Sequence, residues 1–442
     1  MPSLISIREY GCLGIHGAPD SLDYAVVDKH AWHWLKNICL TRCNEQSEFL
    51  RLVSKNGHEC IQVRNYVGTL ETPSGTQIEI LPKIAQSDQQ SIARTRFLLR
   101  KMLSRVNRIS WAESEEAHLR TTDRPIIEVL IYKFLNEVSA IVRRGIRSNY
   151  DRVQESARFL RGRLEVSKQI RRPISQQHIF DVEYDDYSPN RAENRLIRSA
   201  LVKSLKWSRT AQNQRLAREL LFTFDGIPYS SNIKNDFSEW SSGRDMVYYR
   251  ALKPWCQLIL NEQSPFVLTG DWKGISFLFP MEQLFEKYVA LQLTRYLSAP
   301  YRLVGQAQSQ HLARHNSDNW FALKPDMLIK ERNKPVYVLD TKWKLINSQL
   351  SDRKSKYLIS QSDMYQLFAY GHKYLKGKGE IFLVYPAHED FSSPLLQFDY
   401  SSELHLWVVP YDLERDYLLI PDMCLMSNIF DFTQQNLVSQ AG

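Results

Sequence analysis

The sequence predicts a multi-domain α+β protein with a β-rich N-terminal domain, a helical middle region and a C-terminal α/β domain. The chain has 442 residues, more than one hydrophobic core ordinarily organises. Its 43% hydrophobic residues, with only 17 Gly and 18 Pro, are typical of a chain that is globular throughout. The hydrophobic pattern changes twice along the chain, and these changes place the boundaries near residues 86 and 265.

Residues 1–86 form the predicted β-rich domain. Strand-like runs at 60–70 and 76–81 flank a turn signal of Thr, Pro, Ser and Gly at 72–75. Residues 28–40 can form one amphipathic helix beside these strands. We expect this domain to dock onto a partner protein, for reasons given with the family resemblance below.

Residues 87–265 form the predicted middle region, which we expect to be mainly helical. Apolar residues recur at three- and four-residue spacing from Ile126 to Val138, directly after Pro125, and helical character continues over 191–223. Residues 266–442 change to a mixed pattern. Helices are predicted at 281–297 and 361–375, and strands at 301–304, 320–330, 335–341, 380–385 and 404–409.

Positive charge is concentrated in the middle region. The net charge is +8, and residues 143–172 hold ten Lys or Arg against three acids, a local net of +7. Such clustering suits DNA or the acidic surface of a partner, although a solvated face or internal ion pairs would give the same pattern. Gly162 permits a turn that could present arginines from a loop. The residues predicted to bind DNA or a partner are Arg143, Arg144, Arg147, Arg158, Arg161, Arg163, Arg171 and Arg172. A second basic run covers 94–108.

Other sequence features point to a reduced, cytoplasmic protein without a membrane span. There is no basic leader followed by an apolar run, and no window of about 18 apolar residues. Six cysteines in so long a chain do not make a disulfide framework. Cys39 and Cys43, with Cys12, Cys60 and nearby histidines, could suggest zinc, but a matching second knuckle is missing and core positions explain them better.

The residues that carry chemistry lie on two neighbouring predicted strands. Asp326 lies in the first, Asp340 and Lys342 in the second, and a hairpin-sized connection at 331–334 joins them. Antiparallel pairing would bring both carboxylates together, and Asp340 and Lys342 would share a face. Paired carboxylates suit Mg²⁺, and a lysine beside them can orient water or stabilise charge on a phosphate. These parts serve phosphodiester hydrolysis.

Two helices offer companion residues to this site. Glu286, on the predicted helix 281–297, could supply a third carboxylate, while Gln366 and Tyr370 lie four apart on one face of the helix 361–375. Each could equally be an ordinary surface or core residue. A second Asp-x-Lys pair, Asp352 and Lys354, lies in a polar run without a strand before it, so we expect a loop there.

The order of these motifs resembles the PD-(D/E)XK nuclease superfamily and, more narrowly, the McrC family, the nuclease subunit of McrBC-type (type IV, 5-methylcytosine-specific) restriction systems. The matching segments are spread in order over most of the chain. They are the residues 67–76, 78–83, 159–164, 187–196 and 339–344, with Tyr365, Gln366 and Tyr370.

The resemblance implies a C-terminal PD-(D/E)XK endonuclease domain that uses Mg²⁺, or Mn²⁺ in its place. It implies metal ligation by Asp326, Asp340, Thr341 and Glu286, and catalytic roles for Lys342, Gln366 and Tyr370. It further implies docking through the N-terminal and middle regions onto an McrB-like hexameric AAA+ GTPase. That partner would recognise modified double-stranded DNA, and this chain would stimulate its GTP hydrolysis. No phosphate-binding G-x-x-x-x-G-K-[ST] loop occurs in the sequence.

Two other functions remain open from the sequence. One is a self-sufficient DNA repair or processing nuclease that uses the same site. The other is a non-catalytic regulator that only activates an NTPase ring, against which the complete set of Asp326, Asp340 and Lys342 argues.

Overall fold

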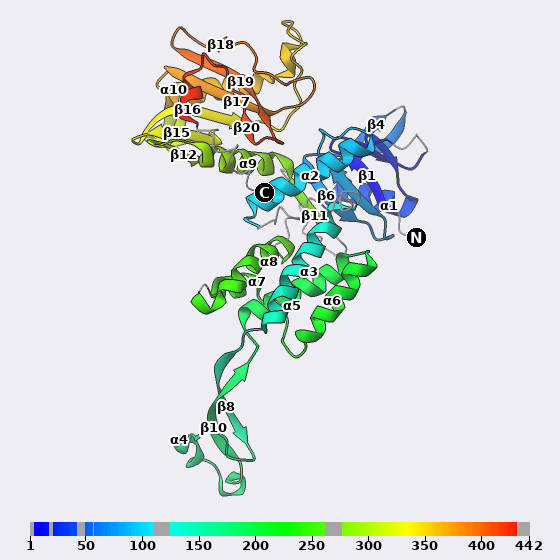
Figure 1. Ribbon diagram of the computed structural model, residues 1–442, viewed down its shortest axis with the longest axis vertical. Coiled ribbons are helices and arrows are strands. Elements are labelled where there is room, and N and C mark those ends of the chain that lie inside the picture. The colour runs from blue at the N-terminus through cyan, green and yellow to red at the C-terminus, as the bar shows by residue number, and fades with distance from the viewer. Residues whose placement is uncertain are drawn as a thin grey trace. The chain divides into compact units, whose positions relative to one another are not determined.

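The structure is a computed structural model that describes residues 4–16, 21–41, 49–55, 57–109, 124–241, 243–260 and 276–430. The chain forms two compact units, one of residues 1–126 with 263–442 and the other of residues 127–262 (Figure 1). The predicted segments 1–86 and 266–442 therefore fall in the same unit, which we call unit 1. The second unit, unit 2, holds most of the predicted middle region.

A four-stranded sheet in unit 1 joins the two ends of the sequence. Its order is β1 (Leu4–Arg8), β7 (Gln77–Leu81), β6 (Tyr66–Glu71) and β11 (Ser276–Pro280). The last strand enters the sheet from beyond the middle region and pairs with β6 in antiparallel register. Gly68 permits this pairing, because its φ is +130° and a Cβ there would lie 2.0 Å from the carbonyl oxygen of Phe277.

A second sheet and one helix complete the N-terminal part. The sheet has the order β3 (Tyr24–Val26), β2 (Cys12–Gly14), β5 (His58–Val63) and β4 (Leu50–Lys55). Helix α1 (Lys29–Thr41) packs against it and confirms the predicted helix. The run 60–70 is two strands rather than one, because the chain turns at Asn65, whose φ is +54°.

Helix α2 (Gln89–Val106) uses part of its basic run within unit 1. Arg96 makes a buried ion pair with Glu79 of β7, 2.6 Å from Nη2 to Oε2. Lys101 pairs with Asp416 at 2.8 Å, and Arg94 pairs with Glu414 at the surface. This segment was a candidate for nucleic-acid contact; the buried and half-buried pairs correct that interpretation for Arg96 and Lys101, whereas Arg94 stays exposed.

The C-terminal part of unit 1 is built on a seven-stranded mixed sheet. Strands β15 and β16 are antiparallel across the predicted hairpin, and β16, β17 and β19 run parallel. The order is β12 (Tyr301–Gly305), β15 (Met327–Glu331), β16 (Lys334–Thr341), β17 (Gly379–Pro386), β19 (Leu404–Asp412) and β18 (Phe398–Asp399), with β20 (Tyr417–Leu418) on β19.

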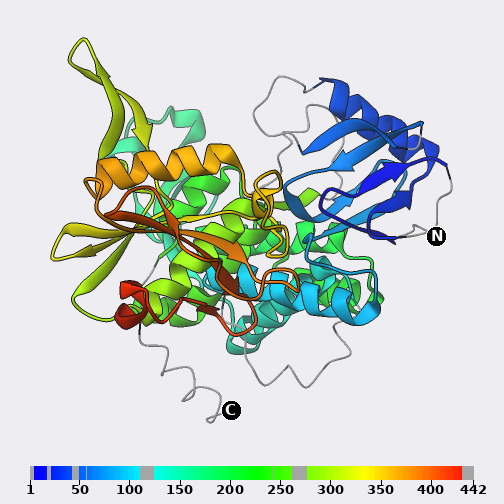
Figure 2. The ribbon, with the colours of Figure 1, turned by 90° about the horizontal axis from the view of Figure 1, so that it is seen from above.

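Two helices cover opposite faces of this sheet (Figure 2). Alternate residues of β19 show it: Leu406 packs in the cluster with helix α10 (Gln361–Tyr374), whereas Tyr411 meets helix α9 (Met281–Tyr296) through ring contacts with Phe285 and Tyr288. Val338 of β16 packs in the α10 cluster, so Asp340, two residues on, faces the same side. The carboxylate of Asp340, near the end of β16, therefore lies on the face of the sheet that α10 covers.

The predicted strand 320–330 is two strands with different partners. Residues 318–323 form β14 (Asp318–Leu323), which pairs with β13 (Gln310–His315), a strand that the sequence did not reveal. The chain then passes Pro325 and Asp326 before β15 begins. Asp326 consequently lies just ahead of the sheet rather than within a strand. Two single-turn helices, η5 (Lys356–Leu358) and η6 (Leu425–Ile429), lie later in the chain.

Unit 2 combines helices with a long β arm. The helices are α3 (Ile126–Arg144), α5 (Ala192–Trp207), α6 (Ala211–Thr223), α7 (Ile233–Glu239), η4 (Arg244–Ala251) and α8 (Leu252–Leu260). The arm, residues 149–188, extends away from them (Figure 1). It contains β8 (Asn149–Ala157), β9 (Arg163–Leu164), α4 (Val166–Gln169), η3 (Ile174–Gln176) and β10 (Phe180–Ser188). The prediction of a mainly helical region was thus wrong for the arm. Across the described residues of both units, no helix is long and apolar enough to cross a membrane.

Candidate functional site

Asp326 is held in place by the residue that follows the second aspartate. Its Oδ2 accepts hydrogen bonds from the backbone N–H and the hydroxyl of Thr341, each at 2.7 Å. Because Thr341 is the last residue of β16 and Asp326 immediately precedes β15, antiparallel pairing of the two strands creates this contact. In this structure Thr341, which we predicted as a metal ligand, orients the carboxylate of Asp326.

Asp340 and Lys342 form a close pair at the end of β16. Lys342 Nζ lies 2.5 Å from Oδ2 of Asp340, whose side chain is 1% exposed. Burial and the charge of Asp326 raise the pKa of Asp340 to about 7, and the ammonium of Lys342 opposes that rise. Burial lowers the pKa of Lys342, but the charges of Asp340 and Asp326 outweigh it and the pKa is raised. The two carboxylates therefore favour the ammonium form of Lys342, which is in contact with Asp340.

Helix α10 supplies a polar relay to this pair. Lys342 Nζ donates to Oε1 of Gln366 at 3.4 Å, and Nε2 of Gln366 donates to the hydroxyl of Tyr370 at 2.7 Å. That hydroxyl donates to the carbonyl of Lys324 at 3.0 Å, two residues before Asp326. The i, i+4 spacing predicted from the sequence thus links the two strand ends through one helix face.

Glu286 approaches the site from α9 on the other side. Its Oε1 accepts from Nε2 of Gln306 at 3.0 Å, and the backbone N–H of Gln306 donates to the carbonyl of Asp326 at 2.8 Å. Burial and the charge of Asp326 raise the pKa of Glu286. The structure therefore brings together all six predicted residues: Asp326, Asp340, Lys342, Glu286, Gln366 and Tyr370.

Sequence reasoning missed two further residues at the site. Gln306 connects Glu286 to Asp326, and Asp363, on the first turn of α10, contributes its charge to Asp340 and Lys342. Asp363 lies three residues before Gln366, a spacing that puts both on one side of a helix and could have identified it. Gln306 follows β12 and carries no comparable signal.

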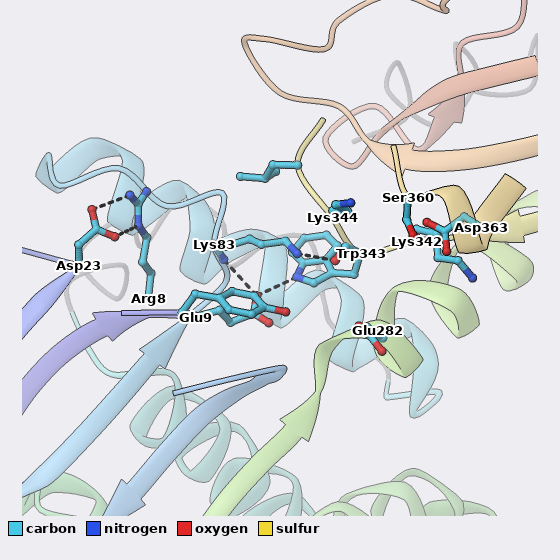
Figure 3. A pocket seen from close by; sticks show the side chains of 12 residues that line it. Arg8, Glu9, Asp23, Lys83, Glu282, Lys342, Trp343, Lys344, Ser360 and Asp363 are labelled. Carbon is cyan, nitrogen blue, oxygen red and sulfur yellow. Dashed lines mark hydrogen bonds and ion pairs between the residues drawn. The ribbon is translucent and has the colours of Figure 1, made fainter. Parts of the chain in front are cut away.

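A groove of about 610 Å³ opens beside Lys342 (Figure 3). Asp363 and Ser360 line it near α10, and Lys83, Glu9 and Glu282 line it on the other side. The groove gives the end of β16 an opening to solvent, although Asp340 itself is buried.

The acidic residues of the site suit a cation that also takes ligands from its substrate. No group of three or more His, Cys, Asp or Glu positioned to hold a metal exists among the described residues. Asp326 and Asp340 nevertheless present two interacting carboxylates, and Oδ1 of Asp326 is not engaged by Thr341. Mg²⁺ is commonly bound by one or two carboxylates, waters and substrate phosphates, so this donor set fits it.

The predicted basic residues divide into paired and open ones. Arg172 holds Asp181 of β10 with two hydrogen bonds at 2.6 Å, which lower the pKa of Asp181 to about 2. Arg161 stacks on Tyr184 at 4.0 Å from the ring centroid and pairs with Asp186 at 3.4 Å. Internal pairing, one alternative from the sequence, therefore explains Arg172 and partly explains Arg161.

The remaining predicted arginines are exposed at the surface. Arg144 stacks on Tyr248 at 4.1 Å, and the backbone of Arg147 bonds to Tyr249 and Asn194. Exposed arginines without these contacts are Arg143, Arg158, Arg163 and Arg171. The arm also exposes Phe159, Leu160, Val166, Ile170 and Ile174, by 57–87% of their areas. The end of the arm therefore combines positive charge with uncovered hydrophobic surface.

Two other sequence features have ordinary structural roles. Asp352 accepts from the backbone N–H groups of Lys354 and Ser355, so the second Asp-x-Lys pair forms a turn, as expected. Cys39 lies on α1 and packs in the core, and Cys43 lies outside the described residues.

Sequence comparison decides the family. A family profile described as "McrBC 5-methylcytosine restriction system component" matches residues 61–386, about three quarters of the chain. The chain belongs to the McrBC family. It is 25% identical over 256 residues, covering 55% of this chain and 71% of the relative, to the type IV methyl-directed restriction enzyme EcoKMcrBC of Escherichia coli strain K12.

Structural comparison finds the same fold in another McrBC protein. A chain in the half-complex of the tetradecameric assembly of Thermococcus gammatolerans McrB AAA+ hexamers with bound McrC aligns with a TM-score of 0.67 and 20% identity, covering 100% of both chains. A second chain, from the Thermococcus gammatolerans McrBC complex, aligns with a TM-score of 0.46 and 22% identity over 67% of this chain and 90% of that one. This member of the McrBC family thus shares its whole fold with the first of these chains.

Proposed function

We propose that this chain is the nuclease subunit of an McrBC-type restriction complex, a Mg²⁺-dependent DNA endonuclease of the PD-(D/E)XK type. The observation that carries the proposal is the single constellation at the end of β16. There Asp326, Asp340 and Lys342 converge with Gln366, in a chain whose family is a restriction system component. Two carboxylates and a lysine with this placement can carry out phosphodiester hydrolysis with a bound cation.

Asp326 and Asp340 would hold the cation, with Glu286 beside them. When bound, the cation polarises the phosphoryl oxygen and lowers the pKa of a bound water. Thr341 fixes the direction of the Asp326 carboxylate through two hydrogen bonds, so this ligand is oriented before substrate arrives. Mn²⁺, with similar preference for oxygen ligands, should substitute.

Lys342 would act on the phosphate and on the attacking water. Asp340 and Gln366 hold its ammonium group between them, and its side chain is 27% exposed toward the groove. From there it can stabilise negative charge on the phosphoryl group or orient a water molecule. Gln366 is in turn fixed by Tyr370, so the relay limits the positions that the ammonium can take.

The partner would be an McrB-like hexameric AAA+ GTPase that recognises modified double-stranded DNA. The related assembly is described as McrB AAA+ hexamers with bound McrC. We assign docking on the ring to the arm of unit 2, because its end exposes Phe159, Leu160, Ile170 and Ile174 beside exposed arginines. A surface that met only phosphates would have less use for these apolar side chains.

The test uses the purified complex with its GTPase partner, GTP and methylated plasmid DNA. Asp340→Ala should abolish cleavage, and excess EDTA should abolish it in the wild type. Asp352→Ala is the matched control, since it alters the other Asp-x-Lys pair at an exposed turn and should cleave normally. Full cleavage by Asp340→Ala, or in EDTA, would exclude the proposed site.

A further inference from the structure

Lys83 and Trp343, which the sequence marked only through the family resemblance, meet in the structure. Lys83 ends the segment 78–83, two residues after β7, and Trp343 lies two residues after β16. Lys83 Nζ donates a hydrogen bond to the carbonyl oxygen of Trp343 (Figure 3). The same ammonium lies over the indole ring, 5.5 Å from its centroid. A residue that follows the N-terminal strand β7 thus binds the residue directly after Lys342.

Glu9, directly after β1, binds both Trp343 and Lys83. Its Oε2 accepts from the indole Nε1–H of Trp343 at 2.7 Å and from the backbone N–H of Lys83 at 3.1 Å. The side chain is 2% exposed, and its Oε1 has no hydrogen-bond partner among the described residues. Burial raises the pKa of Glu9 to about 7 and lowers that of Lys83 to about 8, against their mutual attraction.

Two opposite charges placed near each other and largely out of water, as Glu9 and Lys83 are, add little stability by themselves. Desolvation opposes both charges, and apolar residues of similar size often stabilise a core equally well. What the pair does provide is direction, because it fixes Trp343 at two separate points, the ring nitrogen and the carbonyl oxygen. The ring is also held from α9 by Phe285, at 5.2 Å between centroids.

The backbone of Lys342 lies between Trp343, which Glu9 and Lys83 bind, and the C-terminal sheet. On the sheet side its N–H donates to the carbonyl of Val384 of β17 at 2.9 Å. After it the chain bends at once, since the N–H of Lys344 donates back to the carbonyl of Lys342 at 2.9 Å. The position of Trp343 therefore sets the backbone conformation at Lys342, and with it the direction of the Lys342 side chain.

We infer that Glu9 and Lys83 are positioning residues of the nuclease site, which hold Trp343 and thereby aim the ammonium of Lys342 at Asp340 and Gln366. The inference rests on the proposed nuclease function. It makes the N-terminal sheet a working part of the nuclease as well as a predicted docking domain. The Lys342–Gln366 contact is already long, at 3.4 Å, so a small displacement of the loop breaks it.

Three variants of the full chain test the inference in complex with the GTPase partner. Trp343→Phe keeps a smaller aromatic ring and removes the indole N–H that donates to Glu9. Lys83→Met removes the bond to the Trp343 carbonyl, and Lys83→Arg restores a donor. Lys101→Met is the matched control, because Lys101 also ties the N-terminal part to the C-terminal sheet, through Asp416 and the carbonyl of Leu413, but away from the site.

Single-turnover cleavage should fall on the order of 10- to 100-fold in Trp343→Phe and Lys83→Met, because small displacements from remote changes cost rate to this extent. The DNA concentration for half-maximal rate should stay within about twofold, since no substrate contact is lost. Lys83→Arg should recover most of the rate. Lys101→Met should lower the unfolding temperature and leave the cleavage rate of the folded protein unchanged.

Wild-type cleavage by folded Trp343→Phe would overturn the inference, and this variant decides the matter if Lys83→Met fails to fold. An equal loss of cleavage in Lys101→Met would also overturn it, since any contact between the two parts would then suffice. Stimulation of the partner's GTPase reports folding and should be unchanged in every variant. The failure of the proposed function is seen separately, as absence of cleavage by the wild-type complex.

Discussion

Arg96 provides a quantitative test of how the basic run of α2 is used. In Arg96→Met, Glu79 would keep its hydrogen bond from the hydroxyl of Ser6 at 3.0 Å and lose its charged partner. Removing one member of a buried ion pair costs about 3–5 kcal/mol, because the other charge stays buried. The Ser6 bond favours the lower end, so we expect unit 1 to lose about 3 kcal/mol of unfolding free energy.

Arg94→Met is the matched control on the same helix. Arg94 pairs with Glu414 with 64% and 45% of the side chains exposed, and such surface pairs contribute at most about 1 kcal/mol. Urea unfolding followed by tryptophan fluorescence should therefore separate the two variants by about 2 kcal/mol. The double variant Arg96→Met with Glu79→Leu should recover much of the loss, because no lone charge remains. Equal midpoints for both single variants, or loss of DNA binding by Arg96→Met at unchanged stability, would refute the structural role of Arg96.

Three further predictions concern the arm and the N-terminal sheet. Arg163→Glu should lower GTPase stimulation measured without DNA, while a selective loss of DNA affinity would instead assign the arm to DNA. Asp181 has a depressed pKa, so its contribution to the arm is present above the ordinary carboxylate pKa and is lost as pH falls toward 2; NMR titration should give a midpoint of about 2, and a higher one in Arg172→Gln. An unshifted midpoint in that variant would contradict the assignment. Gly68→Ala should separate β11 from β6 and reduce soluble yield, because the added Cβ meets a backbone oxygen; a normal unfolding temperature would contradict this.

Much of the candidate site could be predicted from the sequence because it rests on local regularities. The period of a strand puts Asp340 and Lys342 on one side, and the period of a helix does the same for Gln366 and Tyr370. The short connection at 331–334 then fixes which strands pair. Gln306 escaped prediction because it lies just after β12, and the pairing of β12 with β15, which brings it to the site, has no signal in the sequence.

The arm escaped prediction because its strands bury few residues: none in β8, and in β10 Val182 and Glu183. Residues of β8 and of β13 are mostly exposed on both faces, so neither strand shows apolar alternation. The pairing of β11 with β6 joins residues about 200 positions apart, for which a single sequence has no signal. The sequence also could not tell buried basic residues from exposed ones. The basic runs of α2 and of the arm look alike in the sequence, although Arg96 is buried and Arg163 is exposed.

The central claim is that one site cleaves DNA while another surface serves the partner. The most direct test measures cleavage and GTP hydrolysis in the same sample of the complex with Asp326→Asn. The account predicts that cleavage falls about 100-fold or more through loss of a metal ligand, while stimulated GTP hydrolysis keeps its wild-type rate. Undiminished cleavage by this folded variant would contradict the account.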